Sequence, residues 1–181
     1  MCNKKASRIP AAIDQGRHRE STMSCLWQDW QSYKELIAKG EDLITDTGAT
    51  YACGLPVPEF QRDLCWSQSQ EILFIESAWL GMPLGTYTVH KMDWHSNGRA
   101  TKYSGWLLDG QQRLTAIQHY WEDKFPVFGL HYSELTQVEK YRFERIKFTH
   151  YEPELWDESL IKELYNRMAL GGVAHKETDR A

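Results

Sequence analysis

The chain has 181 residues, of which 41% are hydrophobic and 25% are charged, as expected for one globular domain. Its formal net charge of −4 argues against a protein that coats DNA through overall positive charge, although a local basic groove is compatible with it. No segment is long and apolar enough for a membrane span or a secretory signal, so we expect a cytoplasmic protein with no membrane partner.

The cysteines and aromatic residues leave the chemistry open. The four cysteines form no CxxC pair and have no zinc-type spacing with histidine, which indicates reduced thiols and no structural metal. The eight tryptophans and nine tyrosines are interpreted first as core residues, because aromatic side chains bury large areas, and alternatively as a base-stacking surface.

The first segment, residues 1–22, is polar and carries several basic side chains. We expect a disordered basic arm here, either a leader before a start near Met23 or a nucleic-acid-binding tail. Residues 23–181 are expected to form a single domain.

Two helices are predicted before the middle of the chain. Apolar residues recur at helical spacing over residues 26–39, and Gly40 follows where a helix would end. Prolines in residues 55–58 predict an extended segment that delivers residues 59–66 as a fixed loop. Ser67 and Gln70 form a capping-box pattern for a helix that ends before Gly81.

The second half predicts alternating strands and helices. Residues 85–93 and 103–108 indicate a β-hairpin with its turn at 95–98, and residues 111–121 follow as a helix. Residues 126–132 are a strand candidate. Thr136 and Glu139 predict a cap for a helix to about residue 145, followed by an extended segment at 146–151 and a last helix at 157–170. This mixture predicts an α+β domain.

The candidate site is Asp109-Gly-Gln-Gln-Arg113, where the hairpin passes directly into a helix. Gly110 allows close approach of a ligand to the backbone, the first helical amides favour phosphate, and Arg113 adds a bidentate donor. Asp109 has three candidate roles: capping the helix, holding a divalent cation, or orienting water. On residue pattern alone, a capped helix after a tight turn is the competing interpretation.

Three blocks of sequence resemble the DGQQR family, whose fold is similar to ParB and sulfiredoxin. They are Leu108-Asp-Gly-Gln-Gln-Arg-Leu-Thr-Ala116, the segment 55–66 with its Gln-Arg pair and tryptophan, and the segment 164–172. In the third block Ala169 stands where the family usually has an asparagine. The resemblance implies a small mixed sheet with flanking helices, in a domain found at the N-terminus of modification-dependent restriction endonucleases.

The resemblance also implies binding and hydrolysis of nucleoside triphosphates with Mg²⁺. In this hypothesis the catalytic residues are Asp109, Gln112 and Arg113, and Asp109 also holds the metal. The nucleotide-binding residues are Gln61, Arg62, Gly110, Gln111, Arg113 and Arg167. For Arg62 the competing interpretation is a surface ion pair, and for Arg167 it is a solvated helix end.

A second hypothesis is a non-catalytic protein that binds nucleotide or DNA and regulates or blocks a restriction-type complex. DNA or a restriction-type nuclease subunit would then be the macromolecular partner, and homo-oligomerisation stays open. No nuclease motif is recognised, so we expect no DNA cleavage by this chain alone. His119 lies on the helix that follows Asp109, about two turns from its phosphate end, and a structural role is the first interpretation for it.

Overall fold

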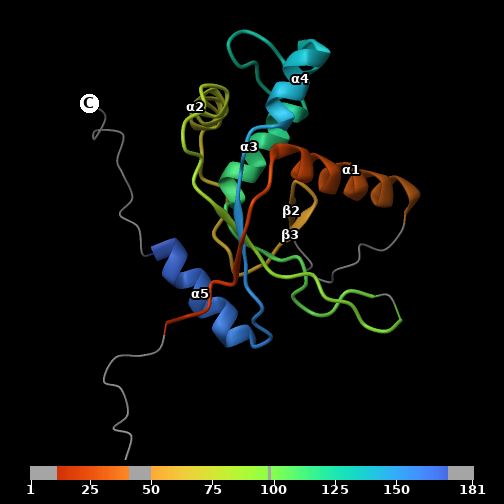
Figure 1. The fold of residues 1–181 in the computed structure, drawn as a ribbon, viewed down its shortest axis with the longest axis vertical. Helices are drawn as coiled ribbons and strands as arrows, with labels where there is room; N and C mark the ends of the chain where they lie inside the picture. The colour runs from red at the N-terminus through yellow and green to blue at the C-terminus, as the bar shows by residue number, and fades with distance from the viewer. Residues whose placement is uncertain (1–11, 41–49, 98, 171–181) are drawn as a thin grey trace, which may run out of the picture.

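The computed structural model describes residues 12–40, 50–97 and 99–170, which form helices around two small sheets (Figure 1). The elements in chain order are β1 (Arg17–Arg19), α1 (Met23–Lys39), β2 (Thr50–Ala52), β3 (Leu55–Val57), α2 (Gln68–Trp79), β4 (Tyr87–Val89), β5 (Leu107–Asp109), α3 (Gln111–Trp121), the 3-10 helix η1 (Tyr132–Glu134), α4 (Gln137–Glu144), β6 (His150–Glu152) and α5 (Glu158–Leu170).

The main sheet is mixed. Its strand order is β1-β6-β4-β5, in which β4 and β6 are parallel and the two outer pairs are antiparallel. Strands β2 and β3 form a separate antiparallel pair. The predicted α+β class, with a small mixed sheet and flanking helices, is confirmed. No helix in the described ranges is long and apolar enough to cross a membrane.

The sheet separates two apolar clusters, because neighbouring strand residues point to opposite faces. Leu107 belongs to the main core, which also contains α1, α2 and α3 side chains such as Leu26, Ile75 and Ile117. Leu108 belongs to a smaller cluster beneath α5. In Figure 1, α5 lies toward the bottom of the view, away from α2 and α4 at the top. Strand β5 therefore ends between the core and α5.

Local signals set most helix ends. Helix α1 ends at Gly40 in the left-handed conformation, and both predicted capping boxes, at Ser67 and Thr136, are present. The hairpin is confirmed as the antiparallel pair β4–β5. The expectation that all tryptophans lie in the core is wrong for Trp94 and Trp156, which are exposed.

Two segments differ from their predictions. Residues 126–132 are not a strand: Phe128 and Gly129 have positive φ, so the chain turns tightly and Val127 pairs with Leu130. The expected disordered arm contains β1, which pairs with β6 and is joined to it by an Arg19–Glu152 ion pair of 2.8 Å. Main-chain pairing gives this polar segment its order, and residues 1–11 lie outside the described part.

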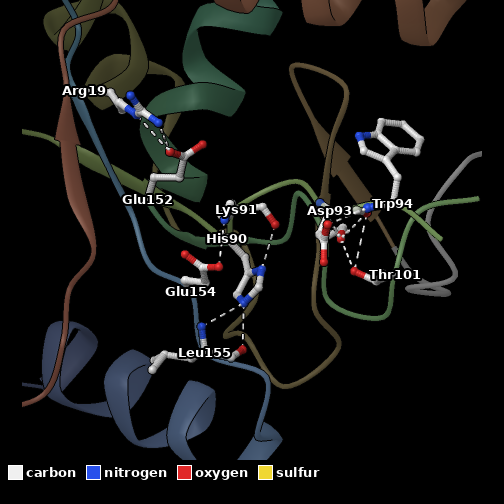
Figure 2. A network of polar contacts seen from close by, with 10 residues as sticks. Arg19, His90, Lys91, Asp93, Trp94, Thr101, Glu152, Glu154 and Leu155 are labelled. Atoms are coloured by element: carbon white, nitrogen blue, oxygen red, sulfur yellow. Dashed lines mark hydrogen bonds and ion pairs between the residues drawn. The ribbon is translucent and has the colours of Figure 1, made fainter. Parts of the chain in front are cut away.

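A polar network joins the hairpin to the segment before α5 (Figure 2). The buried ring of His90 has Nδ1 3.0 Å from the Lys91 carbonyl oxygen and Nε2 2.7 Å from that of Leu155. Lys91 and Glu154 form an ion pair of 2.7 Å beside it. These contacts fix where α5 begins, and thus where its side chains lie relative to the end of β5.

Candidate functional site

The predicted strand-to-helix corner is present. Strand β5 ends at Asp109, Gly110 caps α3 with a φ of 99°, and α3 begins at Gln111. A Cβ added to Gly110 would lie 2.6 Å from Cβ of Tyr87 on the neighbouring strand. Only glycine combines that left-handed conformation with that close approach. The corner thus brings the first amides of α3, which have no acceptors within the helix, against the end of the sheet.

Asp109 does not cap α3, because the helix has no side-chain cap. Its Oδ2 instead accepts a hydrogen bond of 2.7 Å from Nη2 of Arg113 one turn later. Nη1 of Arg113 lies 3.4 Å from the carbonyl oxygen of Leu84. A Cβ on Gly85 would lie 2.7 Å from Nη1, so this second glycine leaves the space that the guanidinium fills. The side chain of Arg113 is only 20% exposed and is held in place.

Gln112 has a structural role that the sequence did not indicate. Its buried side chain accepts hydrogen bonds from the main-chain N–H groups of Cys65 and Trp66, both 3.1 Å, and donates one to the carbonyl of Asp63. Both ends of the amide are engaged by the loop before α2. Gln112 therefore positions that loop. The sequence predicted a catalytic role for Gln112, and these contacts are separate from that role.

The same loop carries Gln61 and Arg62. The Gln61 amide donates to the carbonyl of Leu107, and the main-chain N–H of Arg62 donates to Oη of Tyr165 on α5 at 3.0 Å. Phe60 packs its ring against Tyr165 and Trp106. The loop is therefore fixed between β5 and α5, and it places Gln61 and Arg62 beside the corner.

Together these elements enclose a cavity of about 100 Å³, which we call the corner pocket. It is lined by Gln61, Arg62 and Trp66 from the loop, residues 109–113 from the corner, and Tyr165 and Ala169 from α5. Arg62 and Arg113 thus both line a pocket at one helix N-terminus, a combination suited to an anion with several oxygens.

One predicted site residue lies elsewhere. Arg167 is 74% exposed and pairs with Glu163 on the outer face of α5, so it does not line the corner pocket. Tyr165 and Ala169 occupy the inward positions, two residues before and after it. Tyr165 is a pocket residue that sequence reasoning missed; its signal was the helical phase of the last block, in which residues four apart share a face.

The fit of Mg²⁺ depends on Asp109. The described residues contain no group of three or more His, Cys, Asp or Glu side chains placed to hold a metal. Mg²⁺ bound with phosphates needs only one or two carboxylates, however. Asp109 is 40% exposed and uses Oδ2 for Arg113, which leaves Oδ1 for a cation or its water. The corner pocket fits a metal that arrives with its phosphate ligand.

The fold and pocket define an α+β domain with a candidate anion-binding corner. The family model described as "GmrSD restriction endonuclease, N-terminal domain" matches residues 41–174, which is more than half of the chain. The chain therefore belongs to the family of GmrSD restriction endonuclease N-terminal domains, which confirms the resemblance seen in the three sequence blocks. No match was found among the curated proteins or among the solved structures.

Proposed function

We propose that the corner pocket binds the phosphates of a nucleoside triphosphate in a restriction-related context. The observation that carries this proposal is the convergence of Arg62 and Arg113 on the N-terminus of α3. Positive partial charge at the helix end and two guanidinium groups all favour a phosphate chain. Gly110 and Gln111, at the start of α3, line the same pocket.

The size of the corner pocket supports a phosphate subsite. Its volume of about 100 Å³ is below the roughly 300–1,000 Å³ usual for small-molecule pockets. A pocket of that size takes one part of a ligand, and the charged lining makes the phosphate part the best match.

For hydrolysis, water would attack the terminal phosphorus while the bond from that phosphorus to the bridging oxygen breaks, and the leaving phosphate chain takes the electron pair. Mg²⁺, when bound, neutralises charge on the phosphate oxygens. Arg113 and Arg62 would stabilise charge on the same oxygens, and Asp109 would orient the water or the metal through Oδ1. Gln111 lines the pocket and would bind a phosphate oxygen, whereas Gln112 holds the loop.

The Asp109–Arg113 ion pair favours the second candidate function, nucleotide binding without turnover. The Asp109 carboxylate already accepts a hydrogen bond of 2.7 Å from the Arg113 guanidinium, so one of its two oxygens is engaged before a metal or an attacking water arrives. In this form the domain is a nucleotide-dependent switch in a complex with DNA or a nuclease subunit.

Two measurements on the whole chain test the proposal. Nucleoside triphosphate with Mg²⁺ is expected to raise the thermal midpoint, because a ligand that binds only the folded state stabilises it by RT ln(1 + [L]/Kd). Phosphate release from ATP, GTP, CTP and UTP then separates the two forms: binding with turnover supports hydrolysis, and binding without turnover supports the switch. No thermal shift at millimolar nucleotide would contradict both.

A further inference from the structure

A second cavity, which we call the lateral cavity, adjoins the corner pocket. Its volume is about 420 Å³, within the range typical of ligand sites. Gln61, Arg62 and Gln111 line both cavities. A ligand with its phosphates in the corner pocket therefore has room beside it for a larger group.

One face of α3 forms a wall of the lateral cavity. Gln111, Thr115 and His119 line it at positions i, i+4 and i+8, so their side chains follow one another along the helix. At 1.5 Å per residue, eight residues cover about 12 Å. The wall thus extends from the phosphate end of α3 to a point where the sugar and base of a bound nucleotide would lie.

His119 is oriented by a carboxylate from α2. Its Nδ1 lies 3.1 and 3.0 Å from the two carboxylate oxygens of Glu71, which is buried. Because an ionised carboxylate only accepts hydrogen bonds, Nδ1 carries the hydrogen, and in the neutral ring Nε2 is an acceptor. Nε2 has no hydrogen-bond partner among the described residues. In the neutral form of the ring, the Glu71 contact thus leaves Nε2 as an oriented acceptor for a ligand.

The charges of the two cavities differ. The corner pocket is lined by two arginines and by one carboxylate, which is paired with Arg113. The lateral cavity shares Arg62 but adds the carboxylates of Glu59 and Asp63. These acceptors would repel phosphate and would bind N–H or O–H donors, which sugars and bases carry.

We propose that the lateral cavity is the nucleoside subsite, in which Nε2 of His119 accepts a hydrogen bond from a hydroxyl or amino group of the nucleoside. This inference rests on the proposed phosphate role of the corner pocket. His119 is the binding residue, and Glu71 is a positioning residue that acts through it.

The test compares two ligands in calorimetric titrations with Mg²⁺: inorganic tripolyphosphate, which lacks a nucleoside, and each ribonucleoside triphosphate. His119→Asn is the informative variant, because the asparagine amide can still donate to Glu71 while the acceptor at Nε2 is lost. We expect it to weaken binding of the preferred nucleotide by about three- to tenfold, the loss of one hydrogen bond, and to leave tripolyphosphate binding unchanged. Glu71→Gln should also lower the affinity for the nucleotide relative to the affinity for tripolyphosphate.

Deoxynucleotides and different bases identify the donor. If the donor is the 2′-hydroxyl, the wild-type protein should bind the deoxynucleotide more weakly than the ribonucleotide. If the donor is an amino group, the affinity should depend on the base. His95→Asn, at an exposed turn, is the matched control and should change neither affinity.

Four results would overturn the proposal. If His119→Asn binds nucleotide as tightly as the parent, the proposed contact of Nε2 with the nucleoside does not exist. If the variant loses affinity for nucleotide and tripolyphosphate equally, the substitution acts on the fold or on the corner pocket in general. Wild-type protein that binds tripolyphosphate as tightly as nucleotide keeps the corner pocket but removes the nucleoside subsite. Binding of neither ligand would reject the proposed function itself, and the inference with it.

Discussion

Arg113 and Asp109, the last and first residues of the Asp-Gly-Gln-Gln-Arg motif, contact each other across one helical turn at 2.7 Å. The contact orients the guanidinium beside the corner pocket instead of leaving it to move in solvent. It also means that a ligand that engages Arg113 with both nitrogens competes with Asp109. Binding of an anion to Arg113 is therefore expected to weaken the contact between Arg113 and Asp109.

The contacts of Gln112 predict a loss of stability on Gln112→Ala. The substitution leaves three main-chain groups of residues 63–66 without the partners they have in the structure. We expect the free energy of unfolding to fall by about 2–4 kcal/mol, measured by urea denaturation. Gln111→Ala is the matched control and should change it by less than about 0.5 kcal/mol. Equal effects of the two variants would contradict the role of Gln112 in holding the loop before α2.

The corner itself is tested by comparing two glycines. Gly110→Ala must adopt a φ of 99° and place its Cβ 2.6 Å from Cβ of Tyr87, whereas Gly40→Ala needs a φ of 66° with no atom within 4 Å. We expect losses of about 2–5 kcal/mol and about 1–2 kcal/mol respectively, from thermal or urea unfolding. Similar losses would show that the close approach to Tyr87 is relaxed at little cost.

A histidine in the sheet predicts how stability depends on pH. Burial lowers the pKa of the His150 imidazole below its usual 6.5; the Glu152 carboxylate offsets part of this, and the charges of Arg19 and His18 add to the lowering. Because the unfolded state binds this proton more tightly, the contribution of His150 to stability is complete above pH 6.5 and is lost as the pH falls through the folded-state pKa.

His150→Gln should therefore flatten the dependence of the unfolding free energy on pH below 6.5. The measurement is a series of urea unfolding curves between pH 5 and 8, about the range in which histidine titrates. His95→Gln, on an exposed turn, serves as the control. If both variants keep the parent's slope, another group causes the acid sensitivity.

The elements that could be predicted from sequence are those fixed by local chemistry. The capping boxes at Ser67 and Thr136, the glycine after α1, and the strand-to-helix corner each depend on residues close together in the chain. Such signals need no knowledge of tertiary contacts.

The contacts that the sequence did not reveal join residues that are far apart in the chain. Gln112 and Trp66 are 46 residues apart, and Arg19 and Glu152 are 133 apart, so neither contact is visible in a local pattern. Residues 126–132 have the apolar content of a strand, but left-handed backbone at Phe128 and Gly129 reverses the chain. Arg167 has the residue type of a phosphate ligand, while the phase of α5 turns Tyr165 inward in its place.

The most direct measurement is a calorimetric titration of tripolyphosphate with Mg²⁺ into the parent, Arg113→Ala, Arg62→Ala and Arg167→Ala. Arg113 and Arg167 both pair with a carboxylate four residues earlier, but only Arg113 lines the corner pocket. We predict that Arg113→Ala weakens binding by about ten- to a hundredfold, or roughly 1.5–3 kcal/mol, and that Arg167→Ala leaves it unchanged. Circular dichroism checks that each variant is folded, and the exposed Arg62 gives an independent result if Arg113→Ala unfolds. Binding to Arg113→Ala and Arg62→Ala at the parent's affinity would contradict the phosphate role of the corner pocket.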